Sequence, residues 1–202
     1  AIGQIHYVYD QRYLLDVSVS GSAASILRPG HRWGFFPAVG AGWLLSDEKF
    51  LKTDWLNLLK LRASYGISGR ADFANDLYMD MYGAGGTYLF GKTPTKTNGL
   101  KITQLALRDL TYEKSHKLNI GIDFRAFKKL SVAMDVFYDR RTDILVSTEG
   151  KVSSLFGLPI PKENVGVVDN RGFESDIHWT DFTNRWKYAI GGTFSFTRNK
   201  II

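Results

Sequence analysis

The chain has 202 residues and a net charge of +6, and it is rich in glycine and aromatic residues, with 20 Gly, 13 Phe, 10 Tyr and 5 Trp. It contains no cysteine, which excludes disulfide frameworks, cysteine-ligated zinc and thiol catalysis. No stretch approaches the ~18 uninterrupted apolar residues that a transmembrane helix needs. The Lys and Arg residues are scattered along the chain and form no dense basic run. We therefore interpret them as solvated charge, or as charge facing the lumen of a barrel, and expect no nucleic-acid partner.

Alternation of apolar and polar residues predicts eight antiparallel strands and therefore an all-β fold. The fifth strand shows the pattern clearly, because Leu118, Ile120 and Ile122 share one face. Asn119 and Asp123 lie on the other face of the same strand. The eight strands are expected at residues 1–10, 13–20, 33–45, 59–66, 113–124, 130–141, 170–179 and 186–198.

Two irregular features stand beside this pattern. Pro37 falls inside the third predicted strand and has no N–H to donate to a ladder. We therefore expect a bulge or a local break there, near the loop-side rim of the sheet. The segment 47–58, which follows this strand, is expected to contain a short helical turn.

The connections between the predicted strands alternate in length. Those at 11–12, 46–58, 125–129 and 180–185 are short, whereas those at 21–32, 67–112 and 142–169 include two very long ones. Aromatic residues gather on the apolar face beside the short connections, where a ring with a polar edge is stable at a lipid–water interface. This asymmetry is typical of outer-membrane β-barrels. The predicted interface aromatics are Tyr9, Tyr13, Trp43, Phe124, Trp179 and Trp186.

The polar face of the predicted strands is rich in Gly, Ala and Ser. Such small residues suit a wide barrel of about 22 strands around a plug better than a closed eight-stranded barrel, whose own side chains must fill it. Two alternatives remain open. One is a self-contained small outer-membrane barrel with a structural or adhesive role. The other is a soluble all-β domain that binds or hydrolyses carbohydrate, in which the apolar faces would be packed inside a sandwich.

No catalytic, metal or cofactor site is predicted. Residues 86–93 match the phosphate-binding loop pattern, but Pro94 follows at once, so the helix that this chemistry needs cannot be expected. The four histidines lie far apart and lack metal-ligand spacing. Glu174 and Asp176 share one strand face, as paired glycosidase carboxylates do, and we interpret them as lumen-facing charge.

Six segments, in order and at similar spacing, resemble the SusC/RagA family of TonB-linked outer-membrane proteins. Each segment alone is a weak strand motif, but together they cover nearly the whole chain. One departure is the loop at residues 20–25, which lacks the Asp that the family often carries there. The segments are 12–19 (RYLLDVSV), 32–40 (RWGFFPAVG), 59–69 (LKLRASYGISG), 110–124 (LTYEKSHKLNIGIDF), 136–143 (VFYDRRTD) and 164–174 (NVGVVDNRGFE).

The resemblance implies that residues 1–202 are part of a TonB-dependent receptor β-barrel domain, about eight strands of a roughly 22-stranded barrel, with the plug outside this sequence. It implies a multi-pass protein of the outer membrane that imports a bulky nutrient, an oligosaccharide or a peptide, without catalysis in this segment. The implied partners are a SusD-like surface lipoprotein, the TonB complex acting through the plug, outer-membrane lipid and the substrate.

The connection at 67–112 is the segment most typical of a functional loop, because connections this long without predicted structure usually have a role. Its aromatic residues would either pack against the barrel mouth and the lid protein or stack on substrate. We predict that Tyr82, Tyr88 and Phe90 contact substrate, since aromatic faces stack on sugar rings and fill apolar pockets.

Overall fold

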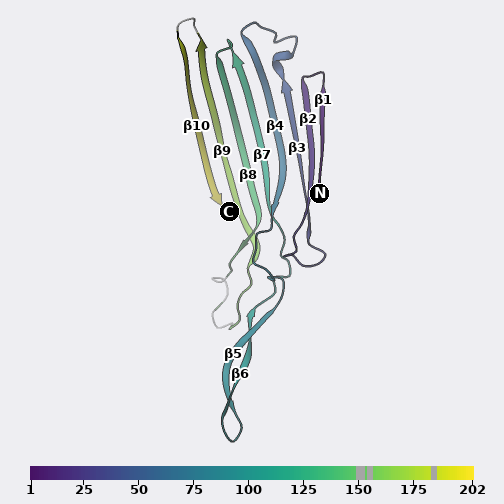
Figure 1. Ribbon diagram of the computed structural model, residues 1–202, viewed down its shortest axis with the longest axis vertical. Helices are drawn as coiled ribbons and strands as arrows, with labels where there is room; N and C mark the ends of the chain where they lie inside the picture. The colour runs from purple at the N-terminus through teal and green to yellow at the C-terminus, as the bar shows by residue number, and fades with distance from the viewer. Residues whose placement is uncertain (149–152, 154–156, 183–185) are drawn as a thin grey trace.

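The computed structural model describes residues 1–148, 153, 157–182 and 186–202 (Figure 1). An eight-stranded antiparallel sheet has the strand order β1-β2-β3-β4-β7-β8-β9-β10, and the hairpin β5-β6 extends beyond one end of it. The all-β fold predicted from alternation is thus confirmed. The strands are β1 (Ile2–Tyr9), β2 (Tyr13–Ala23), β3 (Trp33–Leu44), β4 (Leu56–Arg70), β5 (Met81–Phe90), β6 (Thr95–Gln104), β7 (Glu113–Ala126), β8 (Leu130–Val146), β9 (Glu163–Phe182) and β10 (Lys187–Ile201).

All eight predicted strands are present, and several run further toward the long-loop end than alternation indicated. The β8–β9 ladder explains part of this difference. Its register shifts between Arg141 and Ile144, and again between Ile144 and Leu145, so strict alternation is lost while pairing continues to Val146. Backbone hydrogen bonding can therefore extend a strand past the point where its side-chain pattern ends.

The connection 67–112 contains regular structure that alternation did not reveal. Its hairpin has register shifts at Met81/Tyr82 and at Ala84/Thr87, where glycines interrupt the strand. The interpretation of this segment as a connection without structure was therefore wrong. Residues 86–93 span the end of β5 and the following turn, and no helix begins there, as the phosphate-loop pattern would require.

Two local expectations are met only in part, since the β3–β4 ladder breaks beside Pro37 without a bulge and the helical turn begins earlier than expected. Pro37 pairs with Val19 of β2 in an uninterrupted register, so no bulge is present on that side. The pairing of β3 with β4 instead stops at Ala38, one residue away, where a residue without an N–H does least harm. The helical turn is a 3₁₀ helix, η1 (Leu45–Asp47), which overlaps the expected segment 47–58 only at Asp47. Within the described residues, no helix has the length and apolar character needed to cross a membrane.

Two tight turns close the short-connection end of the sheet. Asp10 and Gln11 have φ of 50° and 54°, and Phe127 and Lys128 both have φ of 56°. Two successive residues with positive φ are the pattern of the type I′ hairpin turn, whose twist matches that of the flanking strands. Because neither turn contains glycine, the usual Asn-Gly or Asp-Gly signal is missing from the sequence.

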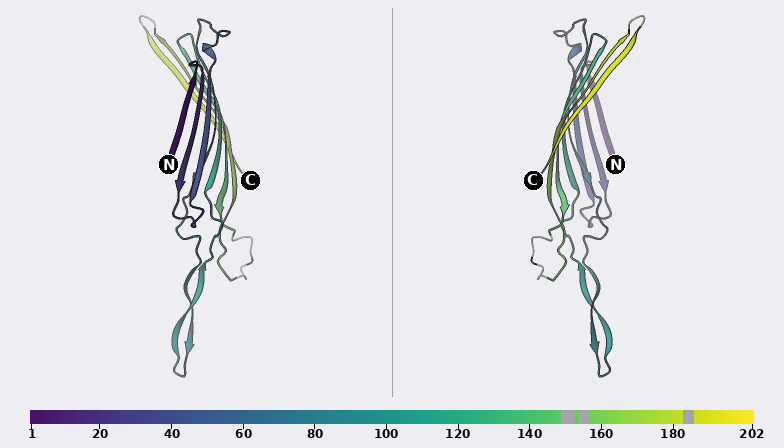
Figure 2. Two further views of the ribbon diagram at one scale, coloured as in Figure 1. Left: turned by 90° about the vertical axis from the view of Figure 1, so that its right-hand side faces the viewer. Right: turned by 90° about the vertical axis from the view of Figure 1, so that its left-hand side faces the viewer.

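The eight-stranded sheet is twisted and open (Figures 1 and 2). Within the described residues, β1 pairs only with β2 and β10 only with β9. The first and last strands do not pair with each other, which contradicts the closed eight-stranded barrel. No second sheet packs against the first in the described part of the chain, and Ile120 and Ile190 are 53% and 68% exposed, which contradicts the soluble sandwich.

The main buried cluster lies in the connections at the long-loop end rather than in the sheet. Leu27, Leu110 and Tyr112 form its centre, each less than 10% exposed. Phe36 packs edge-on against Tyr112, with ring centroids 5.4 Å apart. The Tyr112 hydroxyl lies 2.8 Å from the carbonyl oxygen of Arg32, to which it donates. This loop cluster joins connections that are distant in sequence.

Candidate functional site

The two faces of the sheet differ sharply in chemistry. Register rows that cross it carry apolar side chains on one face, for example the row Ala63–Ile120–Val136–Phe173. The adjacent row on the other face is Arg62–Gly121–Asp135–Glu174. Here these are called the apolar face and the polar face. The apolar residues predicted to share a face do so, and most of them are exposed to the surroundings of the chain.

Aromatic residues border the apolar face at the short-connection end, as predicted. The Tyr13 ring stacks on that of Trp43 with centroids 6.1 Å apart, and Tyr9 lies 6.2 Å from Tyr13. Phe124, Trp179 and Trp186 continue the border along β7, β9 and the start of β10. Contact of these rings with lipid stays a prediction.

Glu48 ties this border to the connection that follows η1. Its carboxylate accepts hydrogen bonds from Tyr13 Oη at 2.7 Å, Trp43 Nε1 at 3.1 Å and Arg12 Nη1 at 2.8 Å. The hydrogen bonds from Tyr13 and Trp43, helped by the charge of Arg12, hold the pKa of Glu48 below its usual value. The Glu48 carboxylate therefore holds the Tyr13 and Trp43 rings in position at the end of the sheet.

Two aromatics of this border escaped the sequence analysis. Trp55 stacks on Phe127 with ring centroids 5.7 Å apart, and it lies 6.4 Å from Phe124. Trp55 stands in a connection and Phe127 in a tight turn, so neither belongs to an alternating run. Only the folded chain shows that both extend the same border.

An ion-pair network crosses the polar face near its middle. Arg62 donates to Asp123 at 2.8 Å and 3.1 Å and to Asp135 at 3.1 Å. The guanidinium passes over Gly121, where an added Cβ would lie 2.5 Å from Asp135 Oδ1 and 2.8 Å from Arg62 Nη2. A larger residue at this position would therefore displace the ends of the Arg62 and Asp135 side chains. Glu174 lies beside Asp135 in the register.

The histidines do not form a metal site. His6 pairs with Asp16 at 2.5 Å, His116 with Tyr65 at 2.9 Å, and His178 with Asp176 at 2.9 Å, on three separate parts of the sheet. In the part of the chain that the structure describes, no group of three or more metal-ligating side chains comes together.

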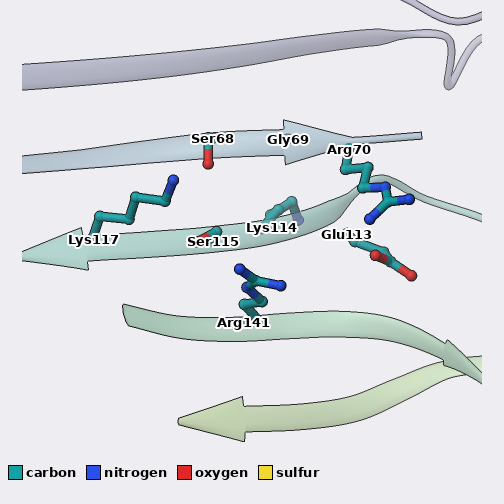
Figure 3. A pocket seen from close by; sticks show the side chains of 8 residues that line it. All are labelled: Ser68, Gly69, Arg70, Glu113, Lys114, Ser115, Lys117 and Arg141. Atoms are coloured by element: carbon teal, nitrogen blue, oxygen red, sulfur yellow. The ribbon is translucent and has the colours of Figure 1, made fainter. Parts of the chain in front are cut away.

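A basic pocket opens on the polar face near the long-loop end, with a volume of about 180 Å³ (Figure 3). Ser68 and Ser115 pair across β4 and β7 at its floor, and Arg141 of β8 lies opposite Ser115. Lys117 stands one step along β7 and reaches into the same space as Ser68 in Figure 3. The lining residues are Ser68, Gly69, Arg70, Glu113, Lys114, Ser115, Lys117 and Arg141.

The charges of this pocket are only partly balanced. Arg141 pairs with Asp139 at 3.5 Å, Arg70 with Asp72 at 2.6 Å and Lys114 with Asp143 at 3.2 Å. Within the described residues, Lys117 has no carboxylate within ion-pair distance. Ser115 Oγ already donates its hydrogen bond to Asp139. The unpaired ammonium of Lys117, the neighbouring guanidinium groups and the Ser68 hydroxyl can bind an anionic group such as a carboxylate. The sequence analysis missed this pocket because its residues come from three strands.

The three predicted substrate-contacting aromatics lie on the β5-β6 hairpin. Tyr82, Tyr88 and Phe90 are 66%, 59% and 62% exposed. Tyr88 and Phe90 lie side by side with ring centroids 6.5 Å apart, whereas Tyr82 lies beyond the register shift. The structure thus brings two of the three together, and their contact with substrate stays a prediction.

The base of the hairpin is fixed to the loop cluster. Gln104 Nε2 donates to the carbonyl oxygens of Asp76 and Met79, at 2.9 Å and 3.2 Å. The N–H of Leu107 donates to the carbonyl oxygen of Leu77 at 2.8 Å. The exposed aromatics therefore stand on an anchored arm beyond the long-loop end of the sheet (Figure 1).

Comparison with known proteins decides the family. The model of the family described as TonB dependent receptor-like, beta-barrel matches residues 6–202. The chain belongs to this family. The TonB-dependent receptors are a family of outer-membrane transporters and receptors. The SusC-like resemblance noted from six sequence segments is confirmed, since the relatives include a protein named SusC.

Two curated TonB-dependent receptors and one solved structure indicate the extent of the likeness. Receptor P39 of Formosa agariphila is 32% identical over 98% of this chain and 19% of its own length. SusC of Bacteroides thetaiotaomicron is 29% identical over 93% of this chain and 19% of its own length. The RagAB peptide importer in its open-open state superposes with a TM-score of 0.85 at 23% identity, over 99% of this chain and 21% of that chain. The chain spans about a fifth of the length of these relatives.

Proposed function

We propose that this chain forms part of the wall of an outer-membrane importer for a bulky nutrient. In this proposal the apolar face contacts lipid, the polar face lines the lumen, and the long connections face the outside. The exposed apolar face with its aromatic border carries the proposal. Exposure of so large an apolar surface is unfavourable in water and favourable in the hydrocarbon of a membrane. The family match supports it.

The basic pocket and the hairpin aromatics favour a substrate with an anionic group and apolar or ring-shaped parts. A peptide with a free carboxylate has both, and so does an acidic oligosaccharide. The pocket lies on the proposed lumen wall near the outer mouth, where an entering substrate first meets the barrel. RagAB, which shares this fold, is named a peptide importer.

Two partners complete the proposed import cycle. A SusD-like lipoprotein would cover the mouth and contact the long connections, among them the β5-β6 arm. The TonB complex would supply energy through a plug, which the residues described here do not contain. Because the pocket and the ion-pair network both face the lumen, substrate and plug would meet the same polar face.

Uptake by cells that express the full-length protein tests the proposal. The double substitution Lys117→Gln and Arg141→Gln should lower uptake of a carboxylated peptide or acidic oligosaccharide by about tenfold, since charge-assisted hydrogen bonds to the anion are lost. Lys49→Gln with Lys52→Gln is the matched control, because it removes equal charge at the opposite end of the sheet. Equal uptake by both variants would contradict the assignment of the pocket.

The hairpin assignment is tested separately. Tyr82, Tyr88 and Phe90 are replaced together by alanine, and the affinity of the full-length protein for its substrate is measured. A loss of affinity is expected, with the larger part arising from the adjacent rings of Tyr88 and Phe90. Unchanged affinity in the triple variant would remove these residues from the substrate site.

A further inference from the structure

Cations gather on the apolar-face side of the sheet at one place, just beyond its apolar part. The register row Tyr138–Arg171–Arg198 crosses β8, β9 and β10, and the next row toward the long loops is Arg140–Asp169–Lys200. Here these two rows are called the outer basic patch. Tyr138, Asp169, Arg171, Arg198 and Lys200, together with Ile202, line a pocket of about 260 Å³.

The border between this patch and the apolar part is abrupt. The row immediately below it is Val136–Phe173–Phe196, and the rings of Phe173 and Phe196 lie 6.4 Å apart. Along β9 the chain passes from Trp179 at one border to Arg171 at the other in nine residues. A tilted strand needs about 9–11 residues to cross the hydrocarbon of a bilayer. Arg171 therefore stands at the height where lipid headgroups begin.

The patch holds more positive than negative charge. Four of its side chains are cationic and one, Asp169, is a carboxylate. Arg140 Nε lies 3.8 Å from Asp169 Oδ1, too far for a hydrogen bond, and this oxygen is buried without a donor in the described residues. Within the same residues, Arg171, Arg198 and Lys200 have no carboxylate at ion-pair distance. The net positive charge of the patch can thus bind an anion.

Among the described residues, β2 and β3 at the other edge of the sheet carry no such patch on the apolar face. At the corresponding border of β3 the apolar face carries Trp33 and Phe35, whose rings stack with centroids 6.4 Å apart. Their register partners on β2 are Ala23 and Gly21. Aromatic and small residues satisfy a lipid interface without a specific ligand. The cations on β8–β10 are therefore a local feature and not part of a uniform girdle.

We propose that the outer basic patch binds the phosphate of a phosphorylated glycolipid in the outward-facing leaflet. Guanidinium groups bind phosphate through paired hydrogen bonds, and basic clusters beside a membrane span recognise anionic headgroups. The Phe173 and Phe196 rings below would contact the acyl chains. This proposal rests on the proposed function, since it requires the apolar face to contact lipid.

Lipid retention by the full-length protein tests it. The protein is placed in phosphatidylcholine nanodiscs doped with lipid A, and bound lipid A is counted by native mass spectrometry. Arg171→Gln, Arg198→Gln and Lys200→Gln together should lower retention at least tenfold. Lys92→Gln, Lys96→Gln and Lys101→Gln on the β5-β6 arm remove the same charge and should leave retention unchanged. Equal retention in the two triple variants would overturn the proposal.

Two further arms identify the ligand chemistry. Dephosphorylated lipid A should bind the unaltered protein as weakly as lipid A binds the patch variant. Millimolar inorganic phosphate should not displace lipid A, and displacement would indicate a free-anion site and overturn the lipid assignment. If the unaltered protein fails to insert into nanodiscs at all, the proposed function fails as well, whereas insertion without lipid A selectivity refutes the patch alone.

Discussion

The eight-stranded sheet and the loop cluster use apolar residues in opposite ways. In the loop cluster, Leu27 and Leu110 are no more than 1% exposed, packed by chain segments from several connections. In the sheet, Ile120 is 53% and Ile190 68% exposed, on a face that no other part of the described chain covers. The difference indicates that the connections fold in contact with water, whereas the apolar face of the sheet suits contact with lipid. The loops exclude water by packing on themselves. The sheet instead presents apolar residues outward, as the proposed contact with lipid requires.

Truncation in the loop cluster should have the largest effect. Leu110→Ala leaves a cavity at a site that is 1% exposed and should cost about 2–5 kcal/mol of local stability. The connections should loosen while the sheet stays intact. Limited proteolysis of the full-length protein in membranes should then cut near residues 71–80 and 105–112, without release of the strands. Resistance equal to that of the unaltered protein would contradict a loop core.

A charge on the apolar face should have the next largest effect. Ile120→Arg places a cation at the middle of the proposed lipid-facing band and should destabilise the membrane-inserted protein by about 2–4 kcal/mol. Its neighbour Asn119 faces the other way, so Asn119→Arg is the matched control and should cost little. Denaturant unfolding in lipid vesicles measures both. Similar stabilities would mean that the two faces meet the same solvent.

A smaller effect is expected at the aromatic border. Because the pKa of Glu48 is lowered in the folded protein, its contribution is complete above the ordinary carboxyl value of 4.5 and is lost as pH falls through the lower folded value. Below that value Tyr13 and Trp43 should lose their shared acceptor. The difference in fluorescence between the unaltered protein and Trp43→Phe should report the change. Glu48→Gln should abolish this pH dependence, and a transition that survives in this variant would arise elsewhere.

Much of the sheet could be predicted from the sequence. A sheet with one apolar face and one polar face needs strict alternation along each strand, as in residues Leu118 to Phe124. The short connections at 11–12 and 125–129 were predicted from breaks in the alternation. The turns there, at Asp10–Gln11 and Phe127–Lys128, lack the glycine that would have indicated their type I′ geometry. The β5-β6 hairpin was missed because glycines and register shifts break its pattern. The basic pocket and the outer basic patch are each formed by residues from several strands, so no single sequence segment predicts either of them.

The side chains that become neighbours across two strands are set by the register of strand pairing, and this register is known only from the structure. Lys117 looks like an ordinary strand cation until Ser68 and Arg141 are placed beside it. Arg171 and Arg198 likewise become a patch only when β9 and β10 are paired. Sequence reasoning therefore located the faces but not the sites on them.

Site-directed spin labelling along β7 tests the central claim most directly. The chain has no native cysteine, so single substitutions to cysteine from 117 to 124 can be labelled without interference. In the membrane-inserted full-length protein, labels at Leu118→Cys, Ile120→Cys and Ile122→Cys should be accessible to oxygen dissolved in lipid. Labels at Asn119→Cys and Asp123→Cys should instead respond to a water-soluble nickel complex or be shielded by the plug. Low oxygen accessibility at all the even positions would show that the apolar face is covered by protein and would contradict the account.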